Sequence, residues 1–496
     1  MNSVPKIRVR SANSLSPRQE GDFVLYWMIA SRRTTWNFAL DRAVEWSEKL
    51  QKPLVIFEAL RSGYPWASDR IHRFVLDGMA ENACWLENTS ALYHPYIEPK
   101  PNAGKGLLTA LASRACAVVT DDFPCFFLPR MVASAARQVP VLMEAVDSNG
   151  LLPIRQAEKC YPTAYAFRRF LQRELPRHLM EFPKVNALLN AKIPKAKPLP
   201  REITKLWPKA SLRLLSSGES VLAGMPLDHA VMPAQTRGGT TAAQRLLRRF
   251  LRDRLPTYAD TRNEPAKQAT SELSPYLHFG HISVHQIFSE LITLEDWSPA
   301  HLAVRATGSR SGWGGTSQNA EAFLDQVFTW RELGFNCSQM QKDYDQFESL
   351  PAWALETLRQ HARDERSHVY PVETFERAKT HDPLWNAAQT QMLHEGRIDN
   401  YLRMLWGKKI IEWTRTPEEA LAIMVELNNK YALDGRDPSS YSGIFWCLGR
   451  YDRPWGPERP VFGTVRYMSS ENTARKFDVR SYIQKYNSPF EAWMKA

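Results

Sequence analysis

The first third of the chain alternates mainly apolar runs with segments of helical periodicity. The apolar runs cover 22–30, 53–60, 115–123 and 139–146, and the periodic segments between them cover 33–50, 72–87 and 129–138. A strand buried on both faces gives such a continuous apolar run. The strand–helix alternation therefore predicts an α/β domain over 21–175 with a parallel, doubly wound, Rossmann-like sheet.

The expected strands carry no recognisable nucleotide-binding motif. No G-x-G-x-x-G run follows any of them and no Walker A motif is present, which disfavours a nicotinamide dehydrogenase or a P-loop enzyme. A ligand of such a sheet binds at the carboxyl ends of the strands. Those ends are expected at 27–33, 58–63, 120–122 and 144–148, and their sequences do not identify the ligand.

The remainder of the chain has a different character. Residues 1–20 are rich in Ser and Arg and are expected to form a disordered basic arm. Frequent prolines and lysines over 176–235 predict a long inter-domain linker. From 236 to 496 the pattern predicts an all-helical domain, and the Gly/Ser-rich stretch 307–318 is expected to be a mobile loop. Helical spacing is clearest over 318–334, 351–361, 384–394, 397–414 and 416–430.

Composition narrows the class of protein. The 496 residues include 64 Lys and Arg against 53 Asp and Glu, a net charge of +11. That surplus suggests a polyanionic partner such as nucleic acid. A basic protein without such a partner is about equally compatible with it. The six cysteines show no C-x-x-C spacing, so zinc and iron–sulfur sites are disfavoured and no metal is expected. No apolar run is long enough to span a membrane. We expect a monomer in the cytoplasm, or in the nucleus of a eukaryote.

Tryptophans gather in the last part of the chain. Trp385, Trp406, Trp413 and Trp446 all lie within polar motifs. Trp406 and Trp413 are seven residues apart, which places both rings on one face of a helix, roughly 10 Å apart along its axis. This spacing is typical of a buried helix stripe, and it also suits electron hopping between indoles.

A hydroxyl-rich segment precedes one of the expected helices. Thr270, Ser271 and Ser274 stand just before or beside Pro275, which suits the first turn of a helix. Hydroxyl groups and free backbone N–H groups at such a position make a site suited to a pyrophosphate. The same pattern is also typical of a capped helix without a ligand.

The full motif is more specific than its parts. The run YADTRNEPAKQATSELSPYLHFGHIS (258–283) resembles the flavin-binding segment of the photolyase/cryptochrome family. The resemblance continues through WRELGFN (330–336), KTHDPLWNAAQ (379–389), YLRMLWGKKIIEW (401–413), LNNKYALDGRDP (427–438) and RPVFGTVRYMSSENTARKFDV (459–479). These motifs are similar to those of class II cyclobutane pyrimidine dimer (CPD) photolyases.

The resemblance implies FAD bound in the helical domain. It also implies that Arg403 and Asp434 form a buried ion pair beside the isoalloxazine, and that Asn428 faces flavin N5. Trp406, Trp413 and Trp385 would form the chain that reduces FAD photochemically. The positions that match the family's remaining FAD contacts are Tyr258, Thr270, Ser271, Leu273 and Ser274.

The same resemblance implies UV-damaged DNA as partner and light-driven splitting of a flipped-out pyrimidine dimer as the reaction. Glu332 matches the carboxylate that reaches the pyrimidine carbonyls. Arg262 and Asn263 match positions near the lesion and its phosphate, and Met404 and Trp446 match apolar contacts to the dimer. Five arginines over 245–254 are expected to hold DNA phosphates.

Several alternatives stay open. A cryptochrome-like photoreceptor would share the flavin and the tryptophans, a (6–4) photoproduct repair enzyme would share the fold, and a nucleic-acid-binding protein without flavin would retain only the fold. The α/β domain is expected to be an antenna domain, with a deazaflavin, a folate or no chromophore.

Overall fold

The computed structural model describes residues 3–487, which fall into two compact units. Unit 1 comprises residues up to 158 together with 174–248 and 273–299, and unit 2 comprises 159–173, 249–272 and the chain from 300 onward. The expected domain ranges were continuous, whereas these units exchange segments. Each is described by itself.

Unit 1 is built on a six-stranded sheet with the order β1-β6-β5-β2-β3-β4. β2 to β6 run parallel, whereas β1 pairs antiparallel with β6. The predicted parallel, doubly wound sheet is therefore confirmed, with one antiparallel edge strand added. The strands are β1 (Val9–Ser11), β2 (Phe23–Met28), β3 (Leu54–Leu60), β4 (Leu92–Ile97), β5 (Ala115–Asp121) and β6 (Met143–Val146).

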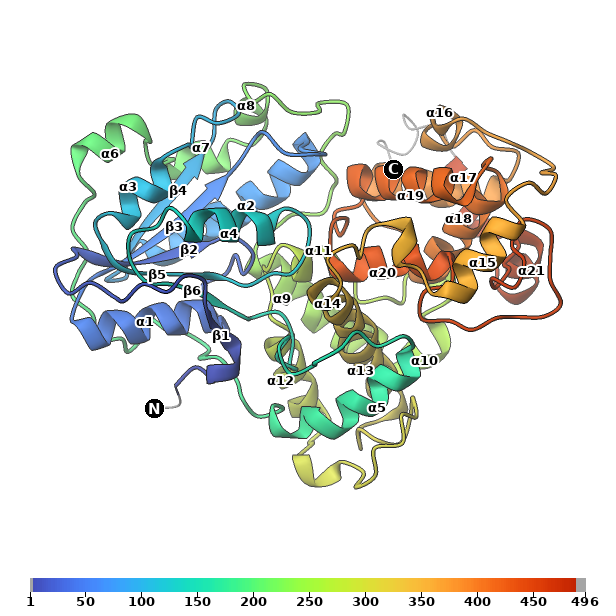
Figure 1. Cartoon of the computed structure of the whole chain (residues 1–496), viewed down its shortest axis with the longest axis horizontal. Helices are drawn as coiled ribbons and strands as arrows, with labels where there is room; N and C mark the ends of the chain where they lie inside the picture. The colour runs from blue at the N-terminus through green and yellow to red at the C-terminus, as the bar shows by residue number, and fades with distance from the viewer. Residues whose placement is uncertain (1–2, 488–496) are drawn as a thin grey trace. The chain divides into compact units, whose positions relative to one another are not determined.

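Helices cover both faces of this sheet (Figure 1). Helix α1 packs on β2 and β5, and α2 packs on β3 and β4. All residues of β2 and β5 are buried, as their continuous apolar sequences predict. The first helices are α1 (Phe38–Leu50), α2 (Asp69–Leu86), α3 (Leu107–Ala112) and α4 (Leu128–Ala136).

The expectation of a disordered N-terminal arm is wrong for the described residues. The short helix η1 (Lys6–Arg8) leads into β1, and Arg8 is completely buried. Its guanidinium donates to the carbonyl oxygens of Gly150 and Leu151 at 3.1 and 2.6 Å. It also lies 3.6 Å from the Asp147 carboxylate. The arm is thus an integral edge of the sheet.

The proline-rich linker runs over unit 1 itself. The backbone N–H of Ala210 donates to the Pro95 carbonyl at 2.8 Å, and the Trp207 indole donates to the Ala103 carbonyl at 3.0 Å. Short helices interrupt the linker: η2 (Leu175–Arg177), α6 (Arg201–Leu206), α7 (Leu212–Ser216) and α8 (Glu219–Leu222). Helix α9 (Thr240–Arg249) follows it.

A later segment, 273–299, also belongs to unit 1. Phe74 stacks on His281 with ring centroids 5.1 Å apart, and Arg33 donates to the Gly280 carbonyl at 3.0 Å. These contacts explain why part of the expected helical domain packs with the sheet. The segment contains α11 (Ser274–His278) and α12 (Val284–Leu294), and η6 (Pro299–His301) follows it.

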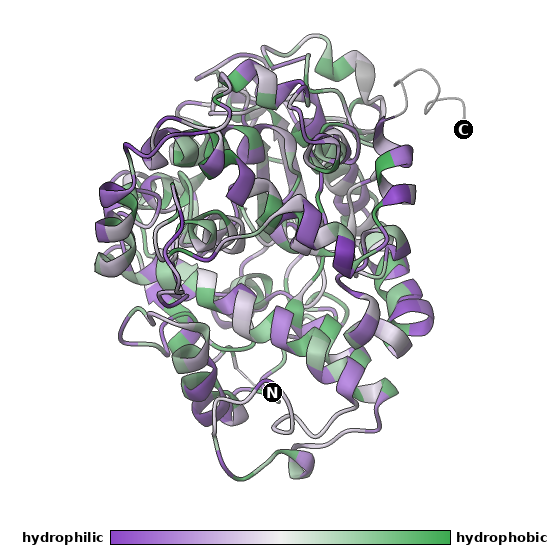
Figure 2. Cartoon of the chain, turned by 90° about the vertical axis from the view of Figure 1, so that its right-hand side faces the viewer, coloured by the Kyte–Doolittle hydropathy of each residue, from purple (hydrophilic) through white to green (hydrophobic). Residues whose placement is uncertain are grey.

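Unit 2 is helical in its described part, and the expected helical domain is confirmed in type. Most helices in Figure 2 carry hydrophilic and hydrophobic residues side by side, as helices with one packed face do. Its helices are α5 (Ala164–Glu174), η3 (Phe250–Arg254), η4 (Leu255–Thr257), α10 (Tyr258–Thr261), η5 (Pro265–Lys267), α13 (Gln318–Leu324), η7 (Asp325–Trp330), α14 (Arg331–Met340), η8 (Phe347–Ser349), α15 (Ala352–Gln360), α16 (Val372–Glu376), α17 (Pro383–Glu395), α18 (Asn400–Glu412), α19 (Pro417–Tyr431), α20 (Pro438–Cys447), α21 (Ser470–Lys476) and α22 (Arg480–Asn487).

The Gly/Ser-rich stretch expected to be a mobile loop is tied down in the structure. The backbone N–H groups of Gly312, Trp313 and Gly314 donate to the Glu321 carboxylate at 2.7, 2.9 and 2.7 Å. The Gly308 N–H donates to Gln172 of α5 at 2.7 Å. These bonds fix the loop against α5 and α13.

Replacing Arg8 by alanine should strongly destabilise the protein, because Asp147 would remain buried without its cation. Breaking a buried pair in this way costs about 3–5 kcal/mol. The midpoint of urea unfolding, followed by circular dichroism, measures the effect. Arg10→Ala is the matched control, because the Arg10 side chain is 43% exposed in its pair with Asp122 and such pairs contribute about 0–1 kcal/mol. Equal shifts for the two variants would contradict the structural role of the N-terminal arm.

Candidate functional site

Three buried tryptophans of unit 2 form a continuous stack. Trp385 of α17 lies parallel to Trp406 of α18, with ring centroids 6.4 Å apart and an interplanar angle of 6°. Trp385 also meets Trp413 edge to face at 6.0 Å and 69°. The three side chains are at most 2% exposed. The structure therefore brings together all three residues predicted for the electron-transfer chain.

The path through these rings differs from the helix stripe expected from the spacing of seven. Helix α18 ends at Glu412, and Trp413 is its C-cap residue. Trp385 comes from α17, which packs on α18, and it contacts both Trp406 and Trp413. The connection therefore runs across two helices.

Hydrogen bonds fix the orientation of two of the rings. The Trp385 indole N–H donates to the Trp406 carbonyl at 3.0 Å, and the Trp406 indole N–H donates to Gln389 Oε1 at 2.9 Å. Asp382, the N-cap of α17, accepts the backbone N–H of Trp385 at 3.0 Å. Both buried indole donors are thus satisfied, so the rings have one defined arrangement.

Glu332 lies on α14 and is only 5% exposed. The neighbouring Arg331 is also buried, and its guanidinium lies 4.4 Å from the centre of the Phe335 ring. Glu332 therefore does not lie on an exposed helix face. The π-helix η7 immediately precedes α14, and such irregular turns are frequent at functional sites.

Four helices that carry candidate residues pack on one another. Helix α20 contacts α14, α18 and α19, and α18 also contacts α19. Asn428 of α19 is 2% exposed, and its Nδ2 donates to Ser440 of α20 at 2.8 Å and to Asn429 at 3.2 Å. The side-chain amide is thus held in one orientation at the centre of this helix group.

Arg403 and Asp434 form the predicted ion pair. Arg403 Nη2 lies 2.9 and 3.1 Å from the two Asp434 carboxylate oxygens, and the side chains are 17% and 10% exposed. Gly435 lets the loop after α19 close, because a Cβ there would come within 2.7 Å of the Asn428 carbonyl oxygen. The ion pair therefore joins α18 to the loop that follows α19, the helix of Asn428.

Met404 and Trp446 lie on the adjoining helices α18 and α20, and both are half-buried. A residue that sequence reasoning missed connects these helices. Lys408 is 0% exposed, donates to the Cys447 carbonyl at 2.6 Å and lies 5.1 Å from the Trp446 ring centre. Its burial could have been suspected from the sequence, because this lysine stands at a helix position where the periodic pattern predicts an apolar residue.

A second cation also contacts Trp446. The Arg466 guanidinium lies 5.7 Å from the Trp446 ring centre and 3.8 Å from that of Trp455. Asp452 holds this guanidinium at 2.8 Å. Burial would raise the pKa of Asp452, but hydrogen bonds from Arg466 and Trp455 bring it below its usual value. Trp446 therefore contacts two cations, Lys408 and Arg466, that hydrogen bonds hold in place.

The segment from Tyr258 to Ser271 belongs to unit 2. Tyr258 is buried edge to face against Phe250 and Phe323, and burial raises its pKa. Arg262 is half-buried, with its guanidinium 6.0 Å from the Tyr258 ring centre, and Asn263 follows it. Thr270 and Ser271 are half-buried, and the Thr270 hydroxyl donates to Asp399 at 3.4 Å.

Leu273 and Ser274 stand in the last segment of unit 1. Leu273 is the buried N-cap of α11, and the exposed Ser274 is its first residue. Because α11 has only five residues, its dipole is small. The groups available to an anion at this helix start are hydroxyl and backbone N–H groups.

The arginines of the basic helix divide into two groups. Arg245 and Arg248 are exposed, as a phosphate-binding surface requires, and the exposed Arg249 also lies 3.7 Å from the Glu272 carboxylate. Arg252 pairs with Asp253 at 2.6 Å, and Arg254 donates to Glu272 at 3.0 Å. The predicted stripe of five is therefore partly neutralised within the protein.

Within the described residues, no group of three or more His, Cys, Asp or Glu side chains is placed to hold a metal ion. No helix described here is both long and apolar enough to cross a membrane.

No family model matches the sequence, but individual proteins do. The chain is 33% identical to the deoxyribodipyrimidine photo-lyase of Methanothermobacter thermautotrophicus over 479 residues, which is 96% of this chain and 97% of that protein. The chain belongs to the deoxyribodipyrimidine photo-lyase family. The photo-lyases of Oryza sativa and Potorous tridactylus are 35% and 33% identical, covering 93% and 97% of this chain and 87% and 84% of their own lengths.

The distribution of these matches agrees with the expected class. Archaeal, plant and marsupial photo-lyases match over nearly the full length, whereas that of Streptomyces griseus is 27% identical over 46% of this chain. The prediction of a class II photolyase is confirmed. The fold resembles that of a bacterial class III photolyase from Agrobacterium tumefaciens, with a TM-score of 0.65, 17% identity and coverage of 98% of this chain and 92% of that one.

The buried Lys408 gives a prediction on pH. Burial lowers its pKa from 10.5 to about 8, whereas the unfolded chain keeps this proton up to the ordinary pKa. Between these two pKa values the unfolded state binds more protons than the folded state. The contribution of Lys408 to the free energy of unfolding therefore rises with pH. Relative to Lys408→Met, the wild type should gain about 1.4 kcal/mol per pH unit over this range. Urea midpoints of both proteins from pH 7 to 10 measure the gain, and a difference that does not change with pH would contradict it.

Proposed function

We propose that this protein is a light-driven DNA repair enzyme that splits cyclobutane pyrimidine dimers. The full-length similarity to deoxyribodipyrimidine photo-lyases supports the reaction. The observation that carries the proposal is the buried stack of Trp406, Trp385 and Trp413. Its neighbouring ring centroids lie 6.4 and 6.0 Å apart, close enough for electrons to pass from ring to ring.

The residues present fit FAD as the cofactor. The Arg403–Asp434 pair combines a fixed cation and a fixed anion that are both still partly accessible, so it offers a donor and an acceptor to a flavin ring. Thr270 and Ser271 offer hydroxyl groups to a diphosphate, with Leu273 and Ser274 following in the same motif. Tyr258 completes the set that matches the family's FAD contacts.

When bound, reduced and excited by near-UV or blue light, FAD would supply the electron that opens the cyclobutane ring and would then take it back. The protein's part is positioning and electrostatics. Asn428, with its amide fixed by Ser440, would present a polar group to the flavin. Trp406 would face the cofactor, and Trp385 and Trp413 would relay electrons to it.

The lesion would be held by residues of the packed helices α14, α18 and α20. Met404 and Trp446 would provide apolar contacts to the flipped-out dimer, since unstacked bases prefer aromatic and apolar surfaces. Glu332, when protonated, would donate a hydrogen bond to a pyrimidine carbonyl as negative charge develops there. Arg262 and Asn263 would lie near the lesion phosphate.

Positive charge would hold the flanking DNA. The net charge of +11 and the exposed Arg245, Arg248 and Arg249 support binding to a phosphate backbone. Affinity for damaged DNA should therefore fall as salt rises.

Glu332→Gln tests the proposed reaction. With an oligonucleotide that carries one thymine dimer, the reduced wild-type protein should restore absorbance near 260 nm in blue light and not in darkness. Glutamine keeps an N–H donor but is a weaker one, so the repair yield should fall roughly tenfold while bound flavin stays at the wild-type level. An unchanged yield would remove Glu332 from the reaction, and a wild type with bound flavin that restores nothing would refute CPD repair.

Trp385→Phe tests the electron path. Because Trp385 is the ring that contacts both Trp406 and Trp413, most photoreduction of oxidised FAD should be lost. Repair should persist once the flavin is reduced chemically. Photoreduction is measured as the loss of flavin absorbance at 450 nm under light. The control variant is Trp353→Phe, on α15. Normal photoreduction in Trp385→Phe would exclude this path.

A further inference from the structure

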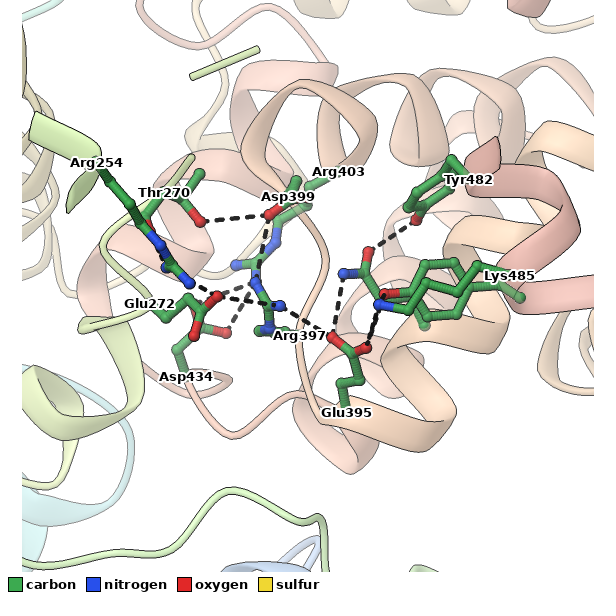
Figure 3. A network of polar contacts seen from close by, with 12 residues as sticks. Arg254, Thr270, Glu272, Glu395, Arg397, Asp399, Arg403, Asp434, Tyr482 and Lys485 are labelled. Carbon is green, nitrogen blue, oxygen red and sulfur yellow. Dashed lines mark hydrogen bonds and ion pairs between the residues drawn. The ribbon is translucent and has the colours of Figure 1, made fainter. Parts of the chain in front are cut away.

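A network of charged residues surrounds the segment 270–272 (Figure 3). At its centre is Arg397, in the turn between α17 and α18. Its guanidinium lies 3.4 Å from Glu272, 3.0 Å from Glu395 and 3.4 Å from Asp399. One cation thus joins Glu395 and Asp399, which flank it in the same turn, to Glu272 of a distant segment.

The same network fixes the backbone of that segment. Arg254 donates to the Thr270 carbonyl at 2.7 Å and to the Glu272 carboxylate at 3.0 Å. Thr270 in turn donates to Asp399. Glu272 has a φ of 58°, in the left-handed region that costs a non-glycine residue about 1–2 kcal/mol. Such a conformation persists only where its surroundings impose it, and it is typical of binding sites.

Little water reaches these charges. The side chains of Glu272, Glu395, Arg397 and Asp399 are 17%, 15%, 16% and 10% exposed. Burial lowers the pKa of Arg397, but the three carboxylates together raise it above its usual value. Without Arg397, Glu272 would keep Arg254 and the more distant Arg249, and Glu395 would keep Lys485. The network would still lose one of its positive charges, and the added negative charge would disfavour an anion at the hydroxyls of 270–271.

The last described helix supports Arg397 from the other side. Glu395 accepts from Lys485 at 3.2 Å and from Tyr486 at 2.7 Å, and Tyr482 donates to Gln391 at 2.7 Å. Helix α22, which carries these donors, packs on α17 and on η5. It therefore contacts the segment before Thr270 and the helix that ends at Glu395.

We propose that Arg397 is a positioning residue for cofactor retention: together with Arg254 it neutralises Glu272, and it holds the segment 270–272 in the shape that grips the FAD diphosphate. This inference rests on the proposed function, because it takes FAD as the ligand of that segment. Arg397 itself need not touch the cofactor. Its effect passes through Glu272 and Asp399, which hold the two ends of the segment.

Flavin release from purified holo-protein tests the proposal. Arg397→Gln should release FAD several-fold faster than the wild type, measured as the rise in fluorescence of free FAD after dilution. The flavin-to-protein absorbance ratio gives the amount retained. Arg397→Lys keeps the charge but loses the forked guanidinium, so its rate of FAD release should lie between those of the wild type and Arg397→Gln. The matched control is Arg415→Gln, because Arg415 is exposed.

A double variant separates electrostatics from simple folding. If Arg397 acts by neutralising Glu272, then Arg397→Gln with Glu272→Gln should release FAD more slowly than Arg397→Gln alone. Release at the wild-type rate by Arg397→Gln, or a double variant no slower than the single, would overturn the proposal. These results are distinguishable from failure of the proposed function, in which the wild type itself would bind no FAD.

Discussion

The contact between α17 and α18 is the one on which the candidate site depends. Trp385 packs in parallel against Trp406, and its N–H donates to the backbone of α18. This fixes the two helices relative to each other along a buried seam. The turn that joins them carries Arg397, and α18 carries Arg403, Met404 and Lys408. The tryptophan cluster, Arg403 of the ion pair and Met404 therefore all depend on this helix pair.

Buried cations recur where this fold has to hold one arrangement. Arg8 fastens the N-terminal edge of the sheet, Arg397 joins three carboxylates and Lys408 links α18 to α20. A buried charge is weak evidence for stability, because apolar residues of similar volume often do as well. Each of these cations instead bonds to specific oxygens on another segment. Specific positioning is therefore the better explanation for Arg397 and Lys408, which adjoin the candidate site.

The sequence was sufficient for the features that depend on local pattern. Long apolar runs gave the central strands, and motif order gave the helical site residues. It failed for β1 and β4. β1 has only three residues, and β4 contains His94 and Pro95, so neither forms an apolar run. Proline is tolerated in β4 because this strand lies at the edge of the sheet.

Contacts between residues that are distant in sequence could not be predicted from the local pattern. The spacing of Trp406 and Trp413 indicated a path along one helix, whereas the ring of Trp385 completes it from another. Lys408 was missed because its burial depends on the Cys447 carbonyl, which is distant in sequence. The same holds for Arg397, whose partners come from segments up to 125 residues away.

The central claim is that light absorbed by a bound, reduced flavin drives repair. The most direct test is an action spectrum of thymine-dimer splitting by the reduced protein loaded with FAD alone. The account predicts that repair per incident photon follows the near-UV and blue absorption of the bound flavin and vanishes in darkness. Equal product in darkness, or a yield that does not follow flavin absorption, would contradict it.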